Sequence, residues 1–480
     1  MDTFKLICSS KTSNDTDKID KKNTTSETQE RENMNVIIIG GDAAGMSAAS
    51  KAKRQMPEIE VMVLEQSEDV SYSACGMPYN IAEADRDIDD LVVRKAHVFR
   101  EKQGIDLKTG HRAESIDTAQ KTVSGVTSAG ETFQFPYDKL LIATGGSPIL
   151  PDIPGMDLPG VMTLKSLNDG RKIKAFLADH PVKRVAIIGM GYIGLEMAEA
   201  LRSRSIHVDM VKPGPVFLPW MKEALSDIVR KELEENQVGL YPRHRIDSIE
   251  TSGNELNLTS PDQTHTADMV LVAVGIKPNS QLAGGSGLEI GVKNAVSVDK
   301  QMRTSDKHIF AAGDCADAYH VVSGKKAWIP LALRANRAGW AVADNVCGKP
   351  TKLPGIVGTA VFRVFDLEVA RTGLTEAEAL ESGFDPVGVV INSRSRAHAH
   401  PGSSTITTHM LADRKTGRLL GTQMVGKEGV AHRITAIAVA LHNHMTVEAF
   451  SQTDLAYAPP FGPTWDPLLT TANQLIKKLR

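Results

Sequence analysis

The sequence has few cysteines, few aromatic residues and no long apolar run. Its four cysteines, Cys8, Cys75, Cys315 and Cys347, have a spacing that fits neither a disulfide framework nor a metal site. No segment approaches the roughly 18 consecutive apolar residues of a membrane span, and Phe4 to Cys8 is too short for a signal peptide. We therefore expect a cytoplasmic protein with no membrane partner and no metal.

Acidic and basic residues are present in nearly equal numbers, 58 and 55. The formal net charge of -3 favours small molecules over nucleic acid as partners. The 480 residues exceed one ordinary core, and 41% hydrophobic and 24% charged residues are average for a globular protein, so two or three domains are expected. Residues 1–33 are polar and charged, and we expect a flexible tail there.

A β-branched strand, a glycine turn and a helix follow the tail. The strand Asn35–Ile39 leads into GGDAAG at 40–45 and then into helix-forming residues, an order that brings a pyrophosphate to a helix N-terminus. Asp42 replaces the second glycine of the usual pattern. Glu65 lies 20 residues after Gly45, where a carboxylate would bind ribose hydroxyls. The predicted dinucleotide site comprises Gly40, Gly41, Ala43, Ala44, Gly45 and Glu65.

A second unit of the same kind begins at Arg184. Its turn, GMGYIG, has the full glycine pattern, and the predicted site comprises Gly189, Gly191, Tyr192, Ile193, Gly194 and Glu196. The position of the ribose-binding acid is Lys212. Unit charges about 4 Å apart interact by roughly 4 kcal/mol at an effective dielectric of 20, so this lysine favours a 2′-phosphate. We expect NADPH to be accepted; alternatively, Lys212 points to solvent and NADH is used.

Three further short strands end in turns with candidate cofactor residues. Thr144-Gly145 and Gly275 follow two of these strands, and Asp314 follows the third, where it would suit a ribityl hydroxyl. Strands that alternate with helices predict an α/β protein with two doubly wound, Rossmann-like domains.

With these motifs, the chain resembles the FAD-dependent pyridine nucleotide-disulfide oxidoreductases. The resemblance is specifically to their single-cysteine branch, which contains coenzyme A-disulfide reductases, NADH oxidases and NADH peroxidases. The resemblance runs from Met34 to the C-terminus and is carried by GGDAAG, SYSACGMPY, LIATG, GMGYIG, VGIKPN, AAGDCAD, IPLALRANRAG and LAYAPPFGPTWDPLL. It implies an FAD domain at 34–149 and 277–347 that includes Ala332, an NAD(P)H domain at 150–276, an α+β dimerisation domain at 350–480, and a homodimer.

The resemblance makes Cys75 the redox centre. Most related reductases have a second cysteine five positions earlier, but Val70 stands there, so the oxidised sulfur must be a sulfenic acid or a mixed disulfide. Electrons would pass from NAD(P)H through the flavin to this sulfur. Tyr457 resembles a tyrosine that crosses the dimer interface and donates a proton to the leaving thiolate.

The resemblance also bears on the substrate. Oxidases and peroxidases of this branch have a histidine where this chain has Ala43, which favours a small disulfide, first coenzyme A disulfide, with persulfide or polysulfide as other candidates. The predicted substrate-binding residues are Ser47, Lys51, Arg54, Ser71 and Asn336. Lys51 and Arg54 lie one turn apart on the first helix and could bind phosphates as a pair, and the resemblance matches Arg54 and Ser71 to substrate-binding residues of the reductases. Ala399 replaces a tyrosine of the reductases, and His398 or His400 either compensates or is simply exposed. Two alternatives stay open: an NADH oxidase or peroxidase, and a flavin-bearing redox sensor or electron-transfer partner.

Overall fold

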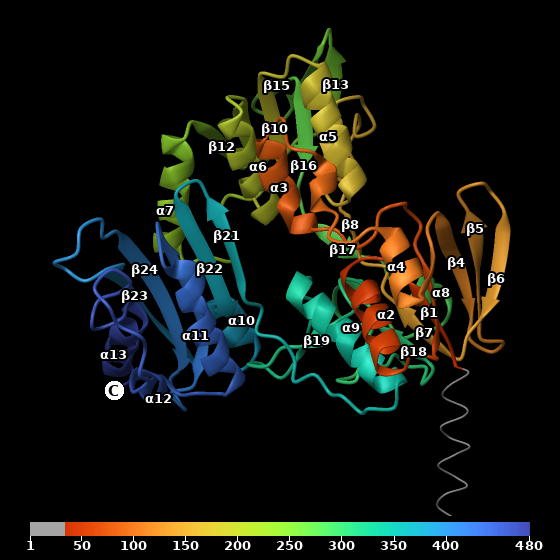
Figure 1. Cartoon of the computed structure of the whole chain (residues 1–480). Coiled ribbons are helices and arrows are strands. Elements are labelled where there is room, and N and C mark those ends of the chain that lie inside the picture. Colours follow the sequence, from red (N-terminus) through yellow and green to blue (C-terminus); the bar gives the residue numbers. More distant parts are fainter. Residues whose placement is uncertain (1–33) are drawn as a thin grey trace, which may run out of the picture.

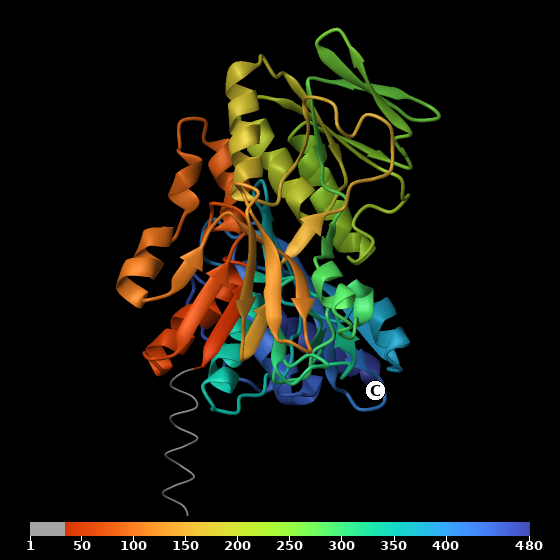
Figure 2. The same ribbon diagram turned by 90° about the vertical axis from the view of Figure 1, so that its right-hand side faces the viewer.

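The computed structural model describes residues 34–480, so the predicted tail at 1–33 lies outside the described residues. Each of three units is built on a five-stranded sheet. In Figures 1 and 2 the second unit stands above the first, and the C-terminal unit lies beside both. The two glycine turns therefore belong to separate sheets, as the sequence predicted, and the α/β class with two Rossmann-like units and a third, C-terminal unit is confirmed.

The first sheet is parallel and has the strand order β18-β7-β1-β2-β3. Its central strands are apolar because helices and a small antiparallel sheet cover them. The bounds are β1 Asn35–Ile39, β2 Glu60–Leu64, β3 Asp106–Lys108, β7 Lys139–Ile142 and β18 Ile309–Ala311, with helices α2 Ala43–Gln55, α4 Ala96–Gln103 and α9 Ala332–Val346, and strands β4 His111–Asp117, β5 Thr122–Thr127 and β6 Thr132–Pro136. Because β18 returns to this sheet late in the chain, the unit is discontinuous in sequence.

The second unit is inserted into the first. The chain enters through β8 (Gly146–Pro148) and leaves through β17 (Ile276–Pro278), which pair antiparallel. Its parallel sheet has the order β12-β11-β10-β16-β9. The bounds are β9 Val161–Thr163, β10 Arg184–Ile188, β11 His207–Lys212, β12 Val238–Pro242, β16 Met269–Val272, α5 Leu167–Asp179, α6 Tyr192–Ser203 and α7 Glu223–Glu235, with β13 Ser248–Ser252, β14 Glu255–Thr259 and β15 Thr264–Ala267 as an antiparallel sheet.

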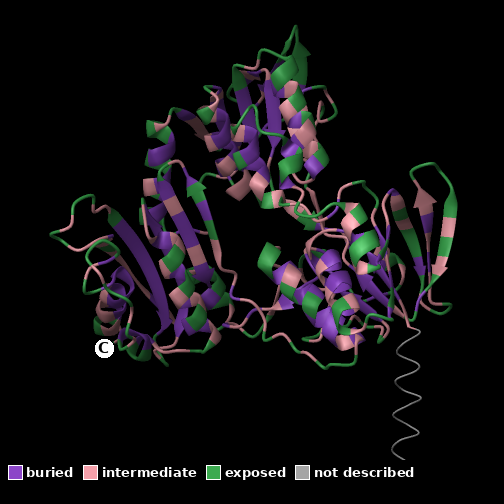
Figure 3. Cartoon of the chain, viewed as in Figure 1, coloured by how far each residue is buried: buried purple, intermediate pink, exposed green. Residues whose placement is uncertain are grey.

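The C-terminal unit is an antiparallel sheet in the order β21-β22-β25-β24-β23, covered by helices. Buried residues follow its strands in the same way as in the other two sheets (Figure 3). The bounds are β21 Ala360–Val364, β22 Leu367–Gly373, β23 Pro386–Arg394, β24 Thr405–Asp413, β25 Leu419–Gly426, α10 Glu376–Glu381, α11 Val430–His442, α12 Val447–Ser451 and α13 Pro467–Leu479. Within residues 34–480, no helix has both the length and the apolar character needed to cross a bilayer.

Candidate active site

The first glycine turn is built so tightly that its glycines cannot be replaced. Gly40 has a φ of +115°, and a Cβ on it would lie 2.2 Å from the carbonyl oxygen of Ala143. A Cβ on Gly45 would lie 1.9 Å from the oxygen of Gly40, so α2 packs directly on the turn. The N–H of Gly41 donates to Oε2 of Glu65 at 2.7 Å. The turn and the predicted ribose-binding carboxylate are therefore neighbours.

The other predicted flavin residues lie at the same edge of this sheet. Thr144 and Gly145 follow β7, and Asp314 follows β18, its parallel neighbour, so all three residues lie at the carboxyl edge of the sheet. Thr144 donates from Oγ1 to the oxygen of Asn279 at 2.6 Å. Helices α2 and α9 begin here, at Ala43 and Ala332, without a side-chain cap, so their first amides stay free for a ligand's phosphates and carbonyls. These residues fit FAD.

The second glycine turn is tightly packed at two glycines and open at the third, which fits a pyridine nucleotide. A Cβ on Gly189 would lie 2.3 Å from the oxygen of Ala273, and one on Gly194 would lie 2.8 Å from the oxygen of Gly189. A Cβ on Gly191, in contrast, would meet nothing within 4 Å. The protein's own packing therefore does not require a glycine at 191, whereas the approach of a pyrophosphate to the backbone does. Gly275, with a φ of +126°, lies on the turn after the neighbouring β16.

Two residues of the second unit lie in surroundings that the sequence did not reveal. Tyr192 packs against Trp220 and Phe362, with ring centroids 5.5 and 4.7 Å away. Lys212 ends β11, and its Nζ donates to the oxygen of Val216 at 2.7 Å, while burial lowers its pKa. The ammonium thus binds its own loop, and binding a 2′-phosphate requires it to exchange that carbonyl for the phosphate.

Cys75 lies in a short 3-10 turn, Ala74–Gly76, directly before α3 (Met77–Ala82). The residue is exposed, yet protein atoms on its other sides desolvate the sulfur, and this burial is the largest cause of its raised pKa. The next largest cause, the negative charge of Glu196, also raises the pKa of Cys75, whereas Lys165 lowers it. The surroundings therefore control how readily the thiolate forms.

Three residues near this sulfur were not predicted. Tyr79, four positions after Cys75, donates from its hydroxyl to Oε1 of Glu196 at 3.0 Å. Lys165 pairs with Asp314, with Nζ and Oδ2 3.3 Å apart. Asp42 has its pKa raised to about 6, mainly by burial and against the opposing effect of Lys165. The helical register from Cys75 could have indicated Tyr79, but Lys165 stands in no motif.

Two of the predicted substrate residues contact each other where α2 packs on α9. Ser47 donates from Oγ to Oδ1 of Asn336 at 2.5 Å. Lys51, one turn along α2, pairs with Asp344 at 2.8 Å and lies over the ring of Trp340. The expectation that Lys51 and Arg54 act as a pair therefore meets a competing partner for Lys51.

The remaining two predicted substrate residues lie at either end of this region. Arg54 is exposed in the last turn of α2. Ser71 has a φ of +50° and donates its N–H to the oxygen of Gly41 at 3.1 Å, which fixes it beside the first glycine turn.

Tyr457 and the Ala399 loop lie together in the C-terminal unit. The N–H of Ala397 donates to the oxygen of Pro459 at 3.1 Å, which joins the two loops. Tyr457 is 52% exposed, and Phe461 and Trp465 beside it are 80% and 64% exposed. The ring nitrogen Nδ1 of His400 lies 3.0 Å from the oxygen of Pro401. The single chain thus presents an aromatic surface around Tyr457.

Comparison with known proteins agrees with this arrangement. Residues 34–339 match the pyridine nucleotide-disulphide oxidoreductase family, and residues 359–467 match its dimerisation domain. The NAD(P)H sulfur oxidoreductase (CoA-dependent) of Pyrococcus furiosus is 39% identical, over 92% of this chain and 99% of its own length. The crystal structure of reduced Bacillus anthracis CoADR-RHD has a TM-score of 0.90 at 30% identity and covers 93% of this chain and 81% of that one. The NAD-dependent persulfide reductase from A. fulgidus has a TM-score of 0.89 at 36% identity, with 93% and 83% covered. This chain belongs to the pyridine nucleotide-disulphide oxidoreductase family and is an FAD-dependent NAD(P)H oxidoreductase.

Proposed function

We propose that the chain reduces a small-molecule disulfide with NAD(P)H and that Cys75 is the reacting residue. The observation that carries this proposal is an exposed thiol on the short turn before α3, next to Glu196, with no second cysteine nearby in the sequence. Cys315 is buried and Cys347 is half-buried, so neither offers a comparable sulfur. FAD, when bound, accepts hydride from NAD(P)H and supplies two electrons to sulfur.

The proposed reaction cleaves one S–S bond per NAD(P)H. The Cys75 thiolate attacks one sulfur of the substrate, the substrate S–S bond breaks, and one thiol leaves as the thiolate and takes up a proton. Cys75 is left in a mixed disulfide with the other half. Two electrons then break this bond, which regenerates the Cys75 thiolate and releases the second thiol. The sum is one disulfide, one NAD(P)H and one proton converted to two thiols and NAD(P)⁺.

Coenzyme A disulfide is the first candidate substrate, and coenzyme A persulfide or polysulfide is the second. The contact of Ser47 with Asn336 and the exposed Arg54 provide polar groups along α2 and α9 for a long phosphorylated thiol. The persulfide candidate is supported by the likeness to the NAD-dependent persulfide reductase from A. fulgidus and to the NAD(P)H sulfur oxidoreductase (CoA-dependent) of Pyrococcus furiosus. Ala43, which cannot transfer a proton, weighs against an oxidase or peroxidase.

We further propose that the enzyme is a homodimer in which Tyr457 serves the site of the second copy. An exposed group of aromatic side chains lies within the segment 359–467 that matches the dimerisation domain, and it comprises Tyr457, Phe461 and Trp465. An exposed apolar surface of this kind is usually covered by a partner. Lys212 is proposed to admit NADPH by binding its 2′-phosphate.

The test is anaerobic turnover of coenzyme A disulfide, coenzyme A persulfide and peroxide by the FAD-loaded enzyme and its Cys75→Ser variant. We expect disulfide or persulfide turnover to be lost in the variant while FAD stays bound and NADPH still reduces it. Cys347→Ser is the matched control and should keep full turnover. Retained turnover in Cys75→Ser, or peroxide turnover that exceeds both sulfur substrates, would contradict the proposal.

A further inference from the structure

The segment that carries Cys75 is a loop between β2 and β3 of the first sheet. The N–H of Val93 donates to the oxygen of Ser71 at 2.9 Å, so the two arms of the loop lie side by side at its base. We call residues 69–93 the cysteine loop. Cys75 stands on its outgoing arm, directly before α3. The place of the sulfur therefore depends on what holds this loop.

The apolar side chains of the cysteine loop are buried in the core of the second unit. That core, which includes side chains of α5 and α6, takes in four residues of the loop, Met77, Ile81, Ile88 and Leu91. Gly170 of α5 makes the close approach possible, because a Cβ on it would lie 3.1 Å from Cδ1 of Ile88 and 3.4 Å from Sδ of Met77. The loop is thus connected to the first unit by the chain but packed on the second.

Arg171, the next residue of α5, bridges both arms of the cysteine loop. Its Nη1 and Nη2 donate to the two carboxylate oxygens of Asp69, each at 2.7 Å. Its Nε and Nη2 donate to Oδ1 of Asp89 at 3.0 and 2.7 Å. Asp69 lies on the outgoing arm and Asp89 on the returning arm. A planar guanidinium can bind two carboxylates in this way, whereas the ammonium of a lysine cannot reproduce the geometry.

Lys174 lies three positions after Arg171 on the same face of α5 and holds the far part of the loop. Its Nζ donates to the backbone oxygens of Asn80 and Glu83 at 3.2 and 2.8 Å, and also to that of Arg86. These oxygens lie at and after the C-terminal end of α3, where a cation is favoured. One helix of the second unit therefore binds the cysteine loop at its base and again beyond α3.

We propose that Arg171 is a positioning residue for Cys75. By joining the two arms to α5 it holds the sulfur where the thiolate attacks the substrate and the flavin returns electrons to it. Asp69 contributes more than Asp89, because its side chain is 15% exposed against 56% and it binds through both oxygens. The inference rests on the proposed role of Cys75 and adds a residue of the second unit to that reaction.

The test follows electrons to Cys75 without the natural substrate. The reduced, FAD-loaded protein with Cys8→Ser and Cys347→Ser is treated with dithiobis(nitrobenzoate), which leaves Cys75 in a mixed disulfide with thionitrobenzoate. NADPH is then added anaerobically in a stopped-flow instrument. Bleaching of the flavin reports hydride transfer to FAD. Release of coloured thionitrobenzoate reports cleavage of the S–S bond by the two electrons of the reduced flavin.

Arg171→Ala should slow thionitrobenzoate release about tenfold, since a small displacement of a reacting atom has an effect of this order, and leave flavin bleaching unchanged. Asp69→Asn should act in the same way, and Asp89→Asn should have the smaller effect. Added guanidinium at millimolar concentration should restore release in Arg171→Ala, because it can bind both carboxylates in the space left by the side chain. Uncharged urea should not restore it.

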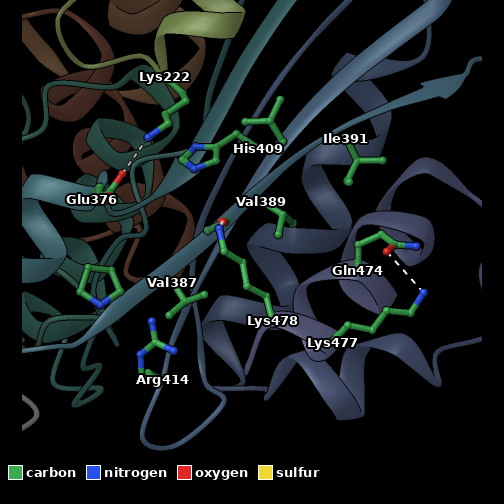
Figure 4. Close-up of a pocket in the computed structure, with 13 residues that line it drawn as sticks. Lys222, Glu376, Val387, Val389, Ile391, His409, Arg414, Gln474, Lys477 and Lys478 are labelled. Carbon is green, nitrogen blue, oxygen red and sulfur yellow. Dashed lines mark hydrogen bonds and ion pairs between the residues drawn. The ribbon is translucent and has the colours of Figure 1, made fainter. Parts of the chain in front are cut away.

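Lys222→Gln is the matched control. Lys222, directly before α7 of the second unit, pairs with Glu376 of the C-terminal unit at 3.1 Å, and both side chains are about half exposed (Figure 4). The groove that these two residues line contains no residue of the cysteine loop. The control thus removes an ion pair between two units and should change neither signal.

Several results would overturn the inference. They are unchanged release in Arg171→Ala, equal slowing of bleaching and release, equal slowing by Lys222→Gln, and rescue by urea as effective as rescue by guanidinium. The last three would indicate a general loss of stability rather than a displaced sulfur. Absence of release from the protein with Arg171 intact would instead contradict the proposed role of Cys75, and the inference would fall with it.

Discussion

The hydrogen bond from Tyr79 to Glu196 gives the sharpest prediction, through Tyr79→Phe. Glu196 is a carboxyl whose pKa is raised by burial, and the Tyr79 hydroxyl, 3.0 Å from Oε1, opposes that rise. A hydrogen bond to a charged group contributes about 1.5–3 kcal/mol. Because Tyr79 is 37% exposed, the lower end of this range, about 1.5 kcal/mol, applies, and its loss raises the pKa of Glu196 further. Phenylalanine keeps the ring below Arg363 and removes only the hydroxyl.

The expected consequence is seen at Cys75. After burial, the charge of Glu196 is the largest cause of the raised pKa of Cys75. In Tyr79→Phe the carboxyl takes up its proton at a higher pH, so there is a window in which it is neutral in the variant and ionised in the wild type. Within that window Cys75 ionises more readily in the variant. Above it, where the carboxyl is charged in both proteins, the difference disappears.

The assay is pulse alkylation of the reduced, FAD-loaded enzyme with iodoacetamide across a pH series, with the Cys75 peptide quantified by mass spectrometry. Tyr79→Phe should be alkylated faster than wild type at the acidic end. Tyr137→Phe is the control, since its hydroxyl has no hydrogen-bond partner among the described residues. Identical profiles for Tyr79→Phe and wild type, or slower alkylation of the variant at low pH, would refute the reasoning.

Three further predictions follow from the glycine turns and the charges beside them. Gly45→Ala should lower the unfolding free energy by about 1–3 kcal/mol and release FAD. Gly191→Ala adds a methyl group that meets no atom within 4 Å, so it should leave the melting temperature unchanged and raise the KM for NAD(P)H. In FAD-free protein the contribution of Asp42 to stability should fall as pH rises from 3.8 to about 6, because folded Asp42 still holds a proton that the unfolded chain has released. The melting temperature of Asp42→Asn should therefore rise relative to that of the wild type over this range. Lys212→Ala should lower the NADPH to NADH ratio of kcat/KM about tenfold, and an unchanged ratio would remove Lys212 from cofactor selection.

The sequence predicted those features that are encoded in consecutive residues. The apolar run Asn35–Ile39 and the glycines after it form a strand and turn because β-branched residues suit a buried parallel strand and because only glycine accepts a φ of +115° at position 40. The same local reasoning identified Glu65, since a parallel neighbour of β1 must end near the turn. Motifs of this kind are short enough to be read from the sequence directly.

The contacts that were missed join residues far apart in the chain. Tyr79 and Glu196 are separated by 117 positions, Lys165 and Asp314 by 149, and Lys51 and Asp344 by 293. Their meeting depends on how two units pack and on the helix pair α2 and α9, which no local pattern specifies. For the same reason, the position of Lys212 at the end of a strand did not predict its hydrogen bond to the oxygen of Val216.

The chemistry of Cys75 follows from this long-range cluster rather than from the motif that contains it. Three carboxyls, Glu196, Asp314 and Asp42, raise the pKa of its thiol, and one ammonium, Lys165, lowers it. Because acids are in the majority, the thiol ionises most easily when Asp42 or Glu196 holds a proton. The pH profile of turnover therefore reports the cluster, and neutralising either Asp42 or Glu196 must move the same limb in the same direction. A profile that responds to Tyr79→Phe but not to Asp42→Asn would show that Glu196 alone controls the sulfur.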